Sequence, residues 1–158
     1  NKTLPKGVKV LDSVLITQKT QSAMASIDGA KYIVYADKKL TKELLQNNID
    51  KFLAQKEILV MKKTKNNEKI TDIRKDIFDM KNMSDEKGVK IYLYLAAGSR
   101  RNLKPEPVIK SFYEYLGLEF EKYCIKYHRL DLMRREEGKG WLALGEEIGV
   151  RCIGGKNE

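Results

Sequence analysis

The sequence predicts an α+β fold, with two main helices packed on one face of a mostly antiparallel sheet of about six strands. Three observations indicate this class. Short apolar, β-branched runs recur along the chain, turn signals separate them, and two segments change to helical spacing. We predict a single domain over 1–132, because no internal repeat or linker divides the chain. Since the chain opens on the approach to a strand, we expect this domain to be the C-terminal half of a larger one.

The first third of the chain is predicted to hold two strands and a helix. Residues 8–17 are apolar and β-branched, which favours a strand. Asp28 and Gly29 mark a turn before a second strand over 30–36. The apolar residues then change to helical spacing, which predicts a helix over 41–55 that begins at a good N-cap residue. The face it should bury consists of Leu44, Leu45, Ile49, Phe52 and Leu53.

The middle of the chain is predicted to form a hairpin and a further strand. A third strand over 57–63 leads into a polar, Asn-rich turn over 64–68. The segment 69–80 is ambiguous, because its isoleucines have helical spacing although an Asn-rich turn favours a return strand. We predict a hairpin that leads into a bent or short helical piece. Clear alternation over 89–97 predicts the next strand.

The last third of the chain is predicted to contain a helix, a strand and a tail. After an Arg-containing loop over 98–104, Pro105 and Pro107 suit the first turn of a helix. Residues 120–130 alternate, which favours a strand. Glycines are dense over 133–158, so we predict a loosely ordered Gly-rich tail there.

The charge of the chain has two interpretations. The net charge is +9, which favours a polyanionic partner such as RNA. Lysine outnumbers arginine strongly, however, and lysines can simply solvate a surface. The arginines are therefore the better indicator, and most of them cluster, at Arg100 and Arg101, at Arg129, and at Arg134 and Arg135.

Composition makes several other classes of protein improbable. No apolar run approaches the roughly 18 residues of a membrane span. Cys124 and Cys152 form no CxxC pair, and with no secretory segment we expect reduced thiols in a cytoplasmic protein. A zinc site needs three or four ligands, and His128 is the only histidine. We therefore predict no metal and no cofactor.

The sequence contains no recognisable catalytic constellation. His128 lies within a predicted strand and has no second histidine to pair with. Asp72, Asp76 and Asp79 lie close together, but basic residues interrupt them, so ion pairs are the simpler interpretation. Gly98 and the residues after it lack the spacing of a phosphate loop. We do not expect this part of the protein to be an enzyme by itself.

Two groups of basic residues are candidates for nucleic-acid contact. Cations can hold phosphates while aromatic rings stack on bases. For the first group the alternative is that lysines guard an exposed strand edge against aggregation. This hairpin group is Lys62, Lys63, Lys65, Lys69, Arg74 and Lys75. The second, the loop group, is Arg100, Arg101 and Lys104, with Tyr92 or Tyr94 as candidate stacking residues.

An ordered set of short motifs resembles a known bacterial family. The set is Leu4-Pro5-Lys6-Gly7-Val8, Ala30-Lys31-Tyr32, residues 58–60, Lys69-x-x-Asp72-Ile73-Arg74-x-x-Ile77, Leu93-x-Leu95-x-x-Gly98 with Leu103-x-Pro105, and Tyr127-x-Arg129. Together these motifs resemble the C-terminal half of the radical SAM-linked bacterial domain of unknown function, over residues 1–132. The chain lacks the three-cysteine motif of an iron–sulfur cluster and the family's first half, which is rich in His, Arg and aromatic residues.

This resemblance implies a setting in RNA metabolism. Members of that family are fused behind a radical SAM protein or encoded beside one, often near a ribonuclease of the E/G type and a ribosomal protein. A fainter similarity runs to the C-terminal subdomain of archaeal/eukaryotic-type pseudouridine synthases, at the helix ending near Gln55, at residues 71–74 and at residues 93–98. In those enzymes an Asp in the earlier half does the chemistry. That likeness is at the level of the fold.

The expected function is a non-catalytic, RNA-binding portion of a radical SAM-linked protein that serves tRNA or rRNA modification or processing. Two alternatives remain open at this point. The chain could be a protein-interaction module that docks a radical SAM partner or the other half of its domain. It could also be a fragment of an RNA-modifying enzyme that resembles pseudouridine synthases.

Overall fold

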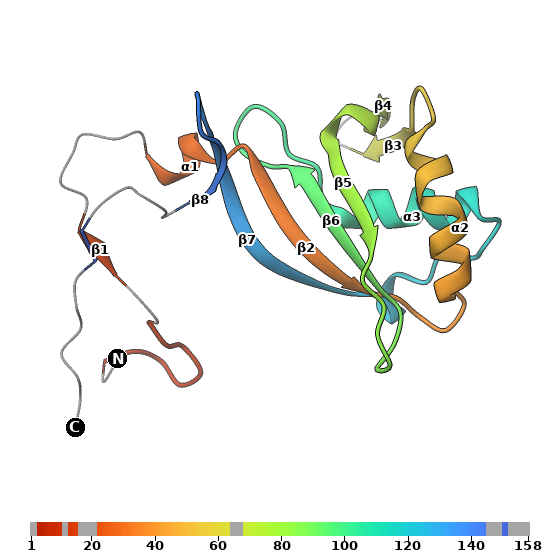
Figure 1. Cartoon of the computed structure of the whole chain (residues 1–158), viewed down its shortest axis with the longest axis horizontal. Coiled ribbons are helices and arrows are strands. Elements are labelled where there is room, and N and C mark those ends of the chain that lie inside the picture. The colour runs from red at the N-terminus through yellow and green to blue at the C-terminus, as the bar shows by residue number, and fades with distance from the viewer. Residues whose placement is uncertain (1–2, 11–12, 16–21, 64–67, 145–149, 152–158) are drawn as a thin grey trace.

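The fold is built on a curled antiparallel sheet of five strands (Figure 1). The computed structural model describes residues 3–10, 13–15, 22–63, 68–144 and 150–151. The α+β class is confirmed. In spatial order the strands are β5 (Ile77–Asn82), β6 (Lys90–Ala96), β2 (Gly29–Tyr35), β7 (Lys126–Glu136) and β8 (Gly140–Ala143).

Two helices bury their apolar faces against the same hydrophobic core. Helix α2 (Lys42–Leu53) begins where the Thr41 hydroxyl accepts a hydrogen bond of 3.2 Å from the Leu44 amide, as the capping pattern predicts. Helix α3 (Pro105–Tyr115) has prolines in its first turn, where no amide partner is lost. The core between helices and sheet includes Phe52, Phe112, Ile109, Leu45, Val34, Ile91, Leu93 and Leu95.

The predicted hairpin forms, but it does not join the main sheet. Strands β3 (Leu59–Lys63) and β4 (Glu68–Asp72) pair only with each other among the described residues. The Asp72 carboxylate accepts hydrogen bonds of 2.9 Å from the amides of Ile58 and Arg74. These bonds end β4 and begin the short helix η1 (Arg74–Asp76), so the chain turns before it enters β5. The bent piece expected after the hairpin is therefore present, followed by a further strand.

The beginning of the chain differs from the predicted strand over 8–17. Val8 and Val10 form no strand, and their side chains are 56% and 50% exposed. Among the described residues of this segment, 8–10 and 13–15, pairing is confined to β1 (Val14–Leu15), which is antiparallel to β9 (Val150–Arg151), and residues 11–12 and 16–17 lie outside the described part of the chain. Apolar, β-branched composition alone therefore does not make a strand of residues 8–10. A short helix, α1 (Ala23–Ser26), precedes β2.

The sheet also extends further along the chain than predicted. Strand β7 continues to Glu136, past the expected domain end at residue 132, and β8 adds the outer strand. A short helix, η2 (Lys122–Cys124), occupies the start of the expected strand over 120–130. Residues 133–143 thus belong to the sheet rather than to a loosely ordered tail. Residues 145–149 and 152–158 of that predicted tail lie outside the described part of the chain.

Candidate functional site

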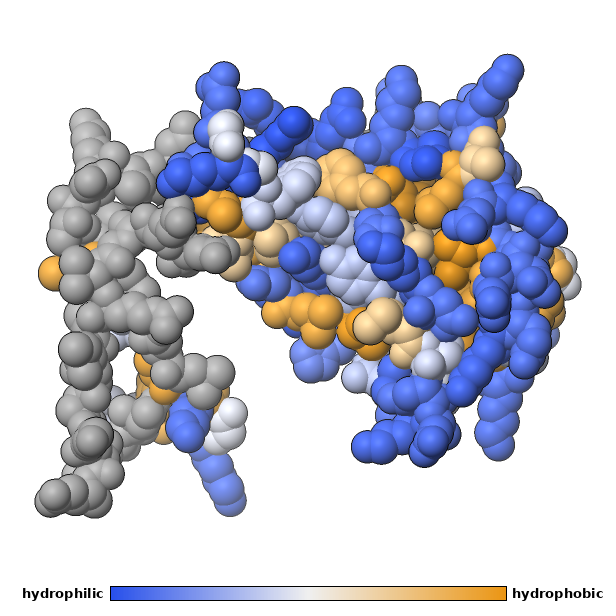
Figure 2. Space-filling model, in the orientation of Figure 1, coloured by the Kyte–Doolittle hydropathy of each residue, from blue (hydrophilic) through white to orange (hydrophobic). Residues whose placement is uncertain are grey.

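The face of the sheet opposite the helices carries aromatic and basic side chains. Because side chains alternate along a strand, the burial of Val34 and Leu93 against the helices sends their strand neighbours to the other face. On that face Lys31 lies opposite Tyr94, and Ile33 lies opposite Tyr92. Figure 2 shows the pale aromatic and blue charged surface that results.

Three aromatic rings from three strands form one cluster at the end of this face. The ring centroids of Phe78, Tyr94 and Trp141 are 5.1 to 5.2 Å apart, two of the pairs edge to face. Tyr94 is only 8% exposed, whereas Phe78 is 42% and Trp141 36% exposed. Gly29 gives the Tyr94 ring its place, since a Cβ on Gly29 would lie 2.7 Å from the tyrosine Cε2. We call Phe78, Tyr94 and Trp141 the aromatic cluster.

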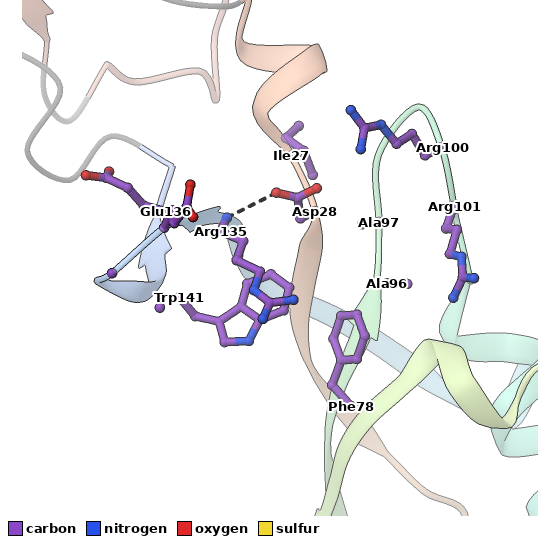
Figure 3. Close-up of a pocket in the computed structure, with 13 residues that line it drawn as sticks. Ile27, Asp28, Phe78, Ala96, Ala97, Arg100, Arg101, Arg135, Glu136 and Trp141 are labelled. Atoms are coloured by element: carbon purple, nitrogen blue, oxygen red, sulfur yellow. Dashed lines mark hydrogen bonds between the residues drawn. The ribbon is translucent and has the colours of Figure 1, made fainter.

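A groove of about 810 Å³ opens beside the aromatic cluster (Figure 3). Phe78 and Trp141 line it at one end, and the loop after β6 and the β7–β8 turn form its walls. The walls are tied together through Asp28. Its amide donates to the Met133 carbonyl at 2.9 Å, and its carbonyl accepts from the Ala97 amide at 3.1 Å. The groove is therefore built from four separate segments of the chain.

Three arginines line the groove, and they differ in their partners. Arg101 forms an ion pair of 3.1 Å with Asp76, which links the loop after β6 to η1. Arg100 and Arg135 are exposed, and neither forms an ion pair with another residue in the described part of the chain. The Arg135 guanidinium carbon lies 6.0 Å from the Trp141 ring centroid, within the range of a cation–π contact. The two guanidinium groups without an ionic partner thus lie on opposite sides of the groove (Figure 3).

The acidic residues of the groove are also not equivalent. Glu136 is paired with Arg134 and, at 3.1 Å, with Lys139, and these hydrogen bonds hold the pKa of its carboxyl below the usual range. The exposed Asp28 carboxylate instead accepts a hydrogen bond of 3.1 Å from the Arg135 backbone amide. Charges of both signs therefore surround the groove, and it is not a simple cationic patch.

One family model, described as an uncharacterized protein conserved in bacteria (DUF2344), matches residues 1–105. The chain belongs to the DUF2344 family. The expected membership of a bacterial family of unknown function is confirmed, over a shorter span than 1–132. Strands β7 and β8, with Arg135 and Trp141, lie beyond the matched residues. No curated protein and no solved structure matches the chain.

Within this DUF2344 chain, the predicted loop group is only partly brought to the groove. Arg100 and Arg101 line it, whereas exposed Lys104 is the N-cap residue of α3 and does not. Tyr92 lies half-buried on the same open face of the sheet. Tyr94 lies within the aromatic cluster, so the more exposed Phe78 and Trp141 rings are better placed than Tyr94 to stack on a base.

The hairpin group is divided between the hairpin and η1, away from the groove lining. Lys62 and Lys63 are on β3, exposed Lys69 is on β4, and Lys65 lies outside the described residues. Lys75 on η1 is exposed. Arg74 is half-buried and structural, because its guanidinium donates to the carbonyls of Leu53 and Ile77. Two of its five N–H donors are therefore engaged by backbone carbonyls, which makes Arg74 a weaker candidate for a phosphate contact than exposed Lys75.

Four polar or aromatic residues on which this description of the groove depends are not among the predicted site residues, namely Asp28, Phe78, Arg135 and Trp141. The clustering of arginines near position 135 was a usable signal. Asp28 had been assigned only to a turn, Phe78 lay in the ambiguous segment, and Trp141 lay in the presumed tail. No local pattern links these positions, because the sheet topology alone brings them together.

The described residues show neither a metal site nor a membrane-spanning helix. The described residues contain no group of three or more His, Cys, Asp or Glu side chains that could hold a metal ion. None of the described helices is long and apolar enough to cross a membrane. His128 is exposed on β7, opposite Ile33. Cys124 is exposed, and its thiol donates to the Glu121 carboxylate at 3.4 Å, which raises the thiol pKa.

Proposed function

We propose that this chain is an RNA-binding, non-catalytic portion of a cytoplasmic protein that acts with a radical SAM protein in tRNA or rRNA modification or processing. One observation carries the RNA part of the proposal. Exposed rings of Phe78 and Trp141 line a groove whose opposite sides hold the guanidinium groups of Arg100 and Arg135. A base stacked on an aromatic ring contributes about 1–3 kcal/mol, and an adjacent arginine can hold the phosphate beside it.

The arrangement suits single-stranded RNA better than a duplex. Stacking requires bases that are not already stacked on each other, as in loops and single strands. An antiparallel sheet that is covered by helices on one face and presents aromatic rings on the other meets that requirement. The fainter resemblance to pseudouridine synthases agrees with an RNA ligand, but it assigns no residue of this chain a catalytic role.

The charges predict a modest salt dependence. The net charge of +9 favours encounter with RNA at long range. At the groove itself, however, Arg101 is neutralised by Asp76, which leaves Arg100 and Arg135 to contact phosphates. For single strands, two phosphate contacts correspond to a slope of about −1.4 in log affinity against log salt. A much steeper slope would mean that the hairpin lysines contact the RNA as well.

The experiment uses Trp141, which is the only tryptophan of the chain. Short single-stranded RNA should quench its fluorescence, and the affinity should fall about sevenfold between about 50 and 200 mM salt. Replacing both Arg100 and Arg135 with alanine should weaken binding and flatten the salt dependence, with folding intact. Lys87→Ala, an exposed lysine in the β5–β6 turn, is the control. Absence of binding at 50 mM salt would refute the proposal.

A second candidate function is docking of another protein through the hairpin. Met61 and Ile70 lie opposite each other in the hairpin register and are 61% and 63% exposed, and Leu59 on the same face is 53% exposed. Exposed apolar side chains grouped in this way are typical of interaction surfaces. Docking through the hairpin does not involve Trp141. A failure of the chain to bind RNA would therefore favour docking as its function.

A further inference from the structure

We propose that the groove selects guanine, and that the Asp28 carboxylate recognises the Watson–Crick edge of that base. The inference rests on the proposed RNA-binding function and adds to it the base that the groove prefers. It depends on three features of the site: the position of Asp28, the hydrogen-bonding capacity of its carboxylate, and the neutralisation of the neighbouring Glu136.

Hydrogen bonds from both the backbone and the side chain hold Asp28 in place. Its amide and carbonyl bond to Met133 on β7 and to Ala97 after β6, and its Oδ2 accepts from the Arg135 amide at 3.1 Å. Figure 3 shows the carboxylate between the Arg135 backbone and Arg100, with the Trp141 and Phe78 rings further along the same groove. A base stacked on these rings would therefore present an edge to a fixed carboxylate.

The Asp28 carboxylate still has room for two further hydrogen bonds. An ionised carboxylate only accepts, and its two oxygens offer about four sites. The Arg135 amide occupies one site on Oδ2, and the structure shows no hydrogen bond to Oδ1 from the described residues. Both oxygens can therefore accept from one ligand edge. Such charge-assisted, bidentate contacts are stronger and more specific than single neutral ones.

Guanine is the base whose edge fits an acceptor of this kind. Its N1–H and its exocyclic N2–H₂ are adjacent donors that can meet two carboxylate oxygens at once. Uracil has a single N3–H between two carbonyl oxygens, which the carboxylate would repel. Adenine and cytosine each offer an amino group beside an unprotonated ring nitrogen, so one oxygen of the carboxylate would face a lone pair. Polar groups left without partners at a binding edge lower affinity strongly.

The surroundings distinguish Asp28 from Glu136, another acid that lines the groove. Glu136 is already engaged by Arg134 and Lys139, so its carboxylate is not available in the same way. The Tyr94 ring packs against Gly29, the residue after Asp28, and its hydroxyl lies 3.2 Å from the position of a Cβ built on Gly29. Burial is the main cause that raises the pKa of the Tyr94 hydroxyl, and the negative charge of Asp28 contributes to the same shift. The Asp28 carboxylate thus belongs to the same groove as the exposed Phe78 and Trp141 rings.

The test measures affinities of the full chain for five-nucleotide single-stranded RNAs that differ only at the central base. Trp141 fluorescence at one fixed salt concentration is the readout, and the midpoint of the titration, not the amplitude, gives the affinity. Wild-type protein should bind a uridine strand with one central guanosine at least tenfold tighter than all-uridine RNA. Central adenosine should resemble uridine, and central inosine, which keeps N1–H but lacks the 2-amino group, should be intermediate.

The variant Asp28→Asn should lose the preference for guanine while it still binds RNA, because its amide replaces one acceptor with a donor. Glu86→Gln, an exposed acid in the β5–β6 turn, makes a matched change of charge and should keep the preference. Equal affinity for guanosine and adenosine in the wild type, or an unchanged preference in Asp28→Asn, would overturn the base selection alone. Failure to bind any of the RNAs would overturn the RNA-binding function with it.

Discussion

At Gly98 the backbone after β6 comes so close to the carbonyl of Ile27 that no side chain fits. A Cβ at this position would lie 2.0 Å from the Ile27 oxygen, and the φ of +132° is itself unfavourable for other residues. The same approach allows the 3.1 Å hydrogen bond from Ala97 to Asp28. Gly98 therefore sets how closely the loop after β6 approaches Ile27 and Asp28, two residues that line the groove, so its role concerns the site as well as the fold.

We expect Gly98→Ala to lower the free energy of unfolding more than Gly88→Ala does. Both glycines have positive φ, but Gly88 has no atom within 4 Å of its would-be Cβ, so it pays only the backbone strain of roughly 1–3 kcal/mol. Gly98→Ala adds a clash that only a backbone shift can relieve. Denaturant unfolding of the two variants measures the difference. Equal losses would mean that the loop relaxes freely and does not fix the groove.

At the scale of elements, η1 works as a junction between the helical layer and the sheet. The Arg74 guanidinium donates to the Leu53 carbonyl at the end of α2 and, at 3.3 Å, to the Ile77 carbonyl at the start of β5. Two residues later, Asp76 receives Arg101 from the groove loop. A segment of three residues thus joins α2, β5 and the loop after β6.

We expect Arg74→Ala to destabilise the protein without weakening RNA binding. Hydrogen bonds from a charged group contribute about 1.5–3 kcal/mol each, and two carbonyls would lose their donor, so the free energy of unfolding should fall by at least about 1.5–3 kcal/mol. Lys87→Ala in the β5–β6 turn is again the control, since this exposed residue should change neither property. Thermal or denaturant unfolding gives the first value and Trp141 quenching the second. A loss of RNA affinity at unchanged stability would restore Arg74 to the binding group.

The elements with strong local signals could be predicted, and those that depend on tertiary context could not. The N-cap at Thr41 and the alternation of β6 are encoded within a few residues, and both predictions are confirmed. The sequence predicts the end of β7 and all of β8 as a loosely ordered tail, because composition cannot distinguish turn glycines from disordered ones. Gly138 and Gly140, at φ of 78° and 81°, in fact turn the chain between these strands. The groove could not be predicted from the sequence either, because its segments are far apart along the chain and meet only in the folded sheet.

At the scale of the whole molecule, two sets of ionisable groups make the stability of the fold depend on pH in opposite directions. Hydrogen bonds and nearby cations lower the pKa of several carboxyls, whose stabilising effect is present above their ordinary pKa and is lost as pH falls. Burial, the main cause in each case, raises the pKa of several tyrosines. The carboxyls are Glu43, Asp72, Asp85, Glu121 and Glu136. The tyrosines are Tyr32, Tyr92, Tyr94, Tyr113 and Tyr127.

The tyrosines therefore predict a loss of stability above about pH 10, the ordinary tyrosine pKa. Above that pH the unfolded chain ionises its tyrosines while the folded chain keeps them neutral, so unfolding releases protons and becomes more favourable. Tyr113 contributes through its burial and its 2.9 Å hydrogen bond to Asp37.

Melting temperatures between pH 5 and 11 should show a plateau and then a fall. Tyr113→Phe should reduce the fall, because phenylalanine cannot ionise, whereas Tyr123→Phe, at a position 96% exposed, should not. An equal fall in Tyr113→Phe and wild type would show that Tyr113 does not contribute to the alkaline limit.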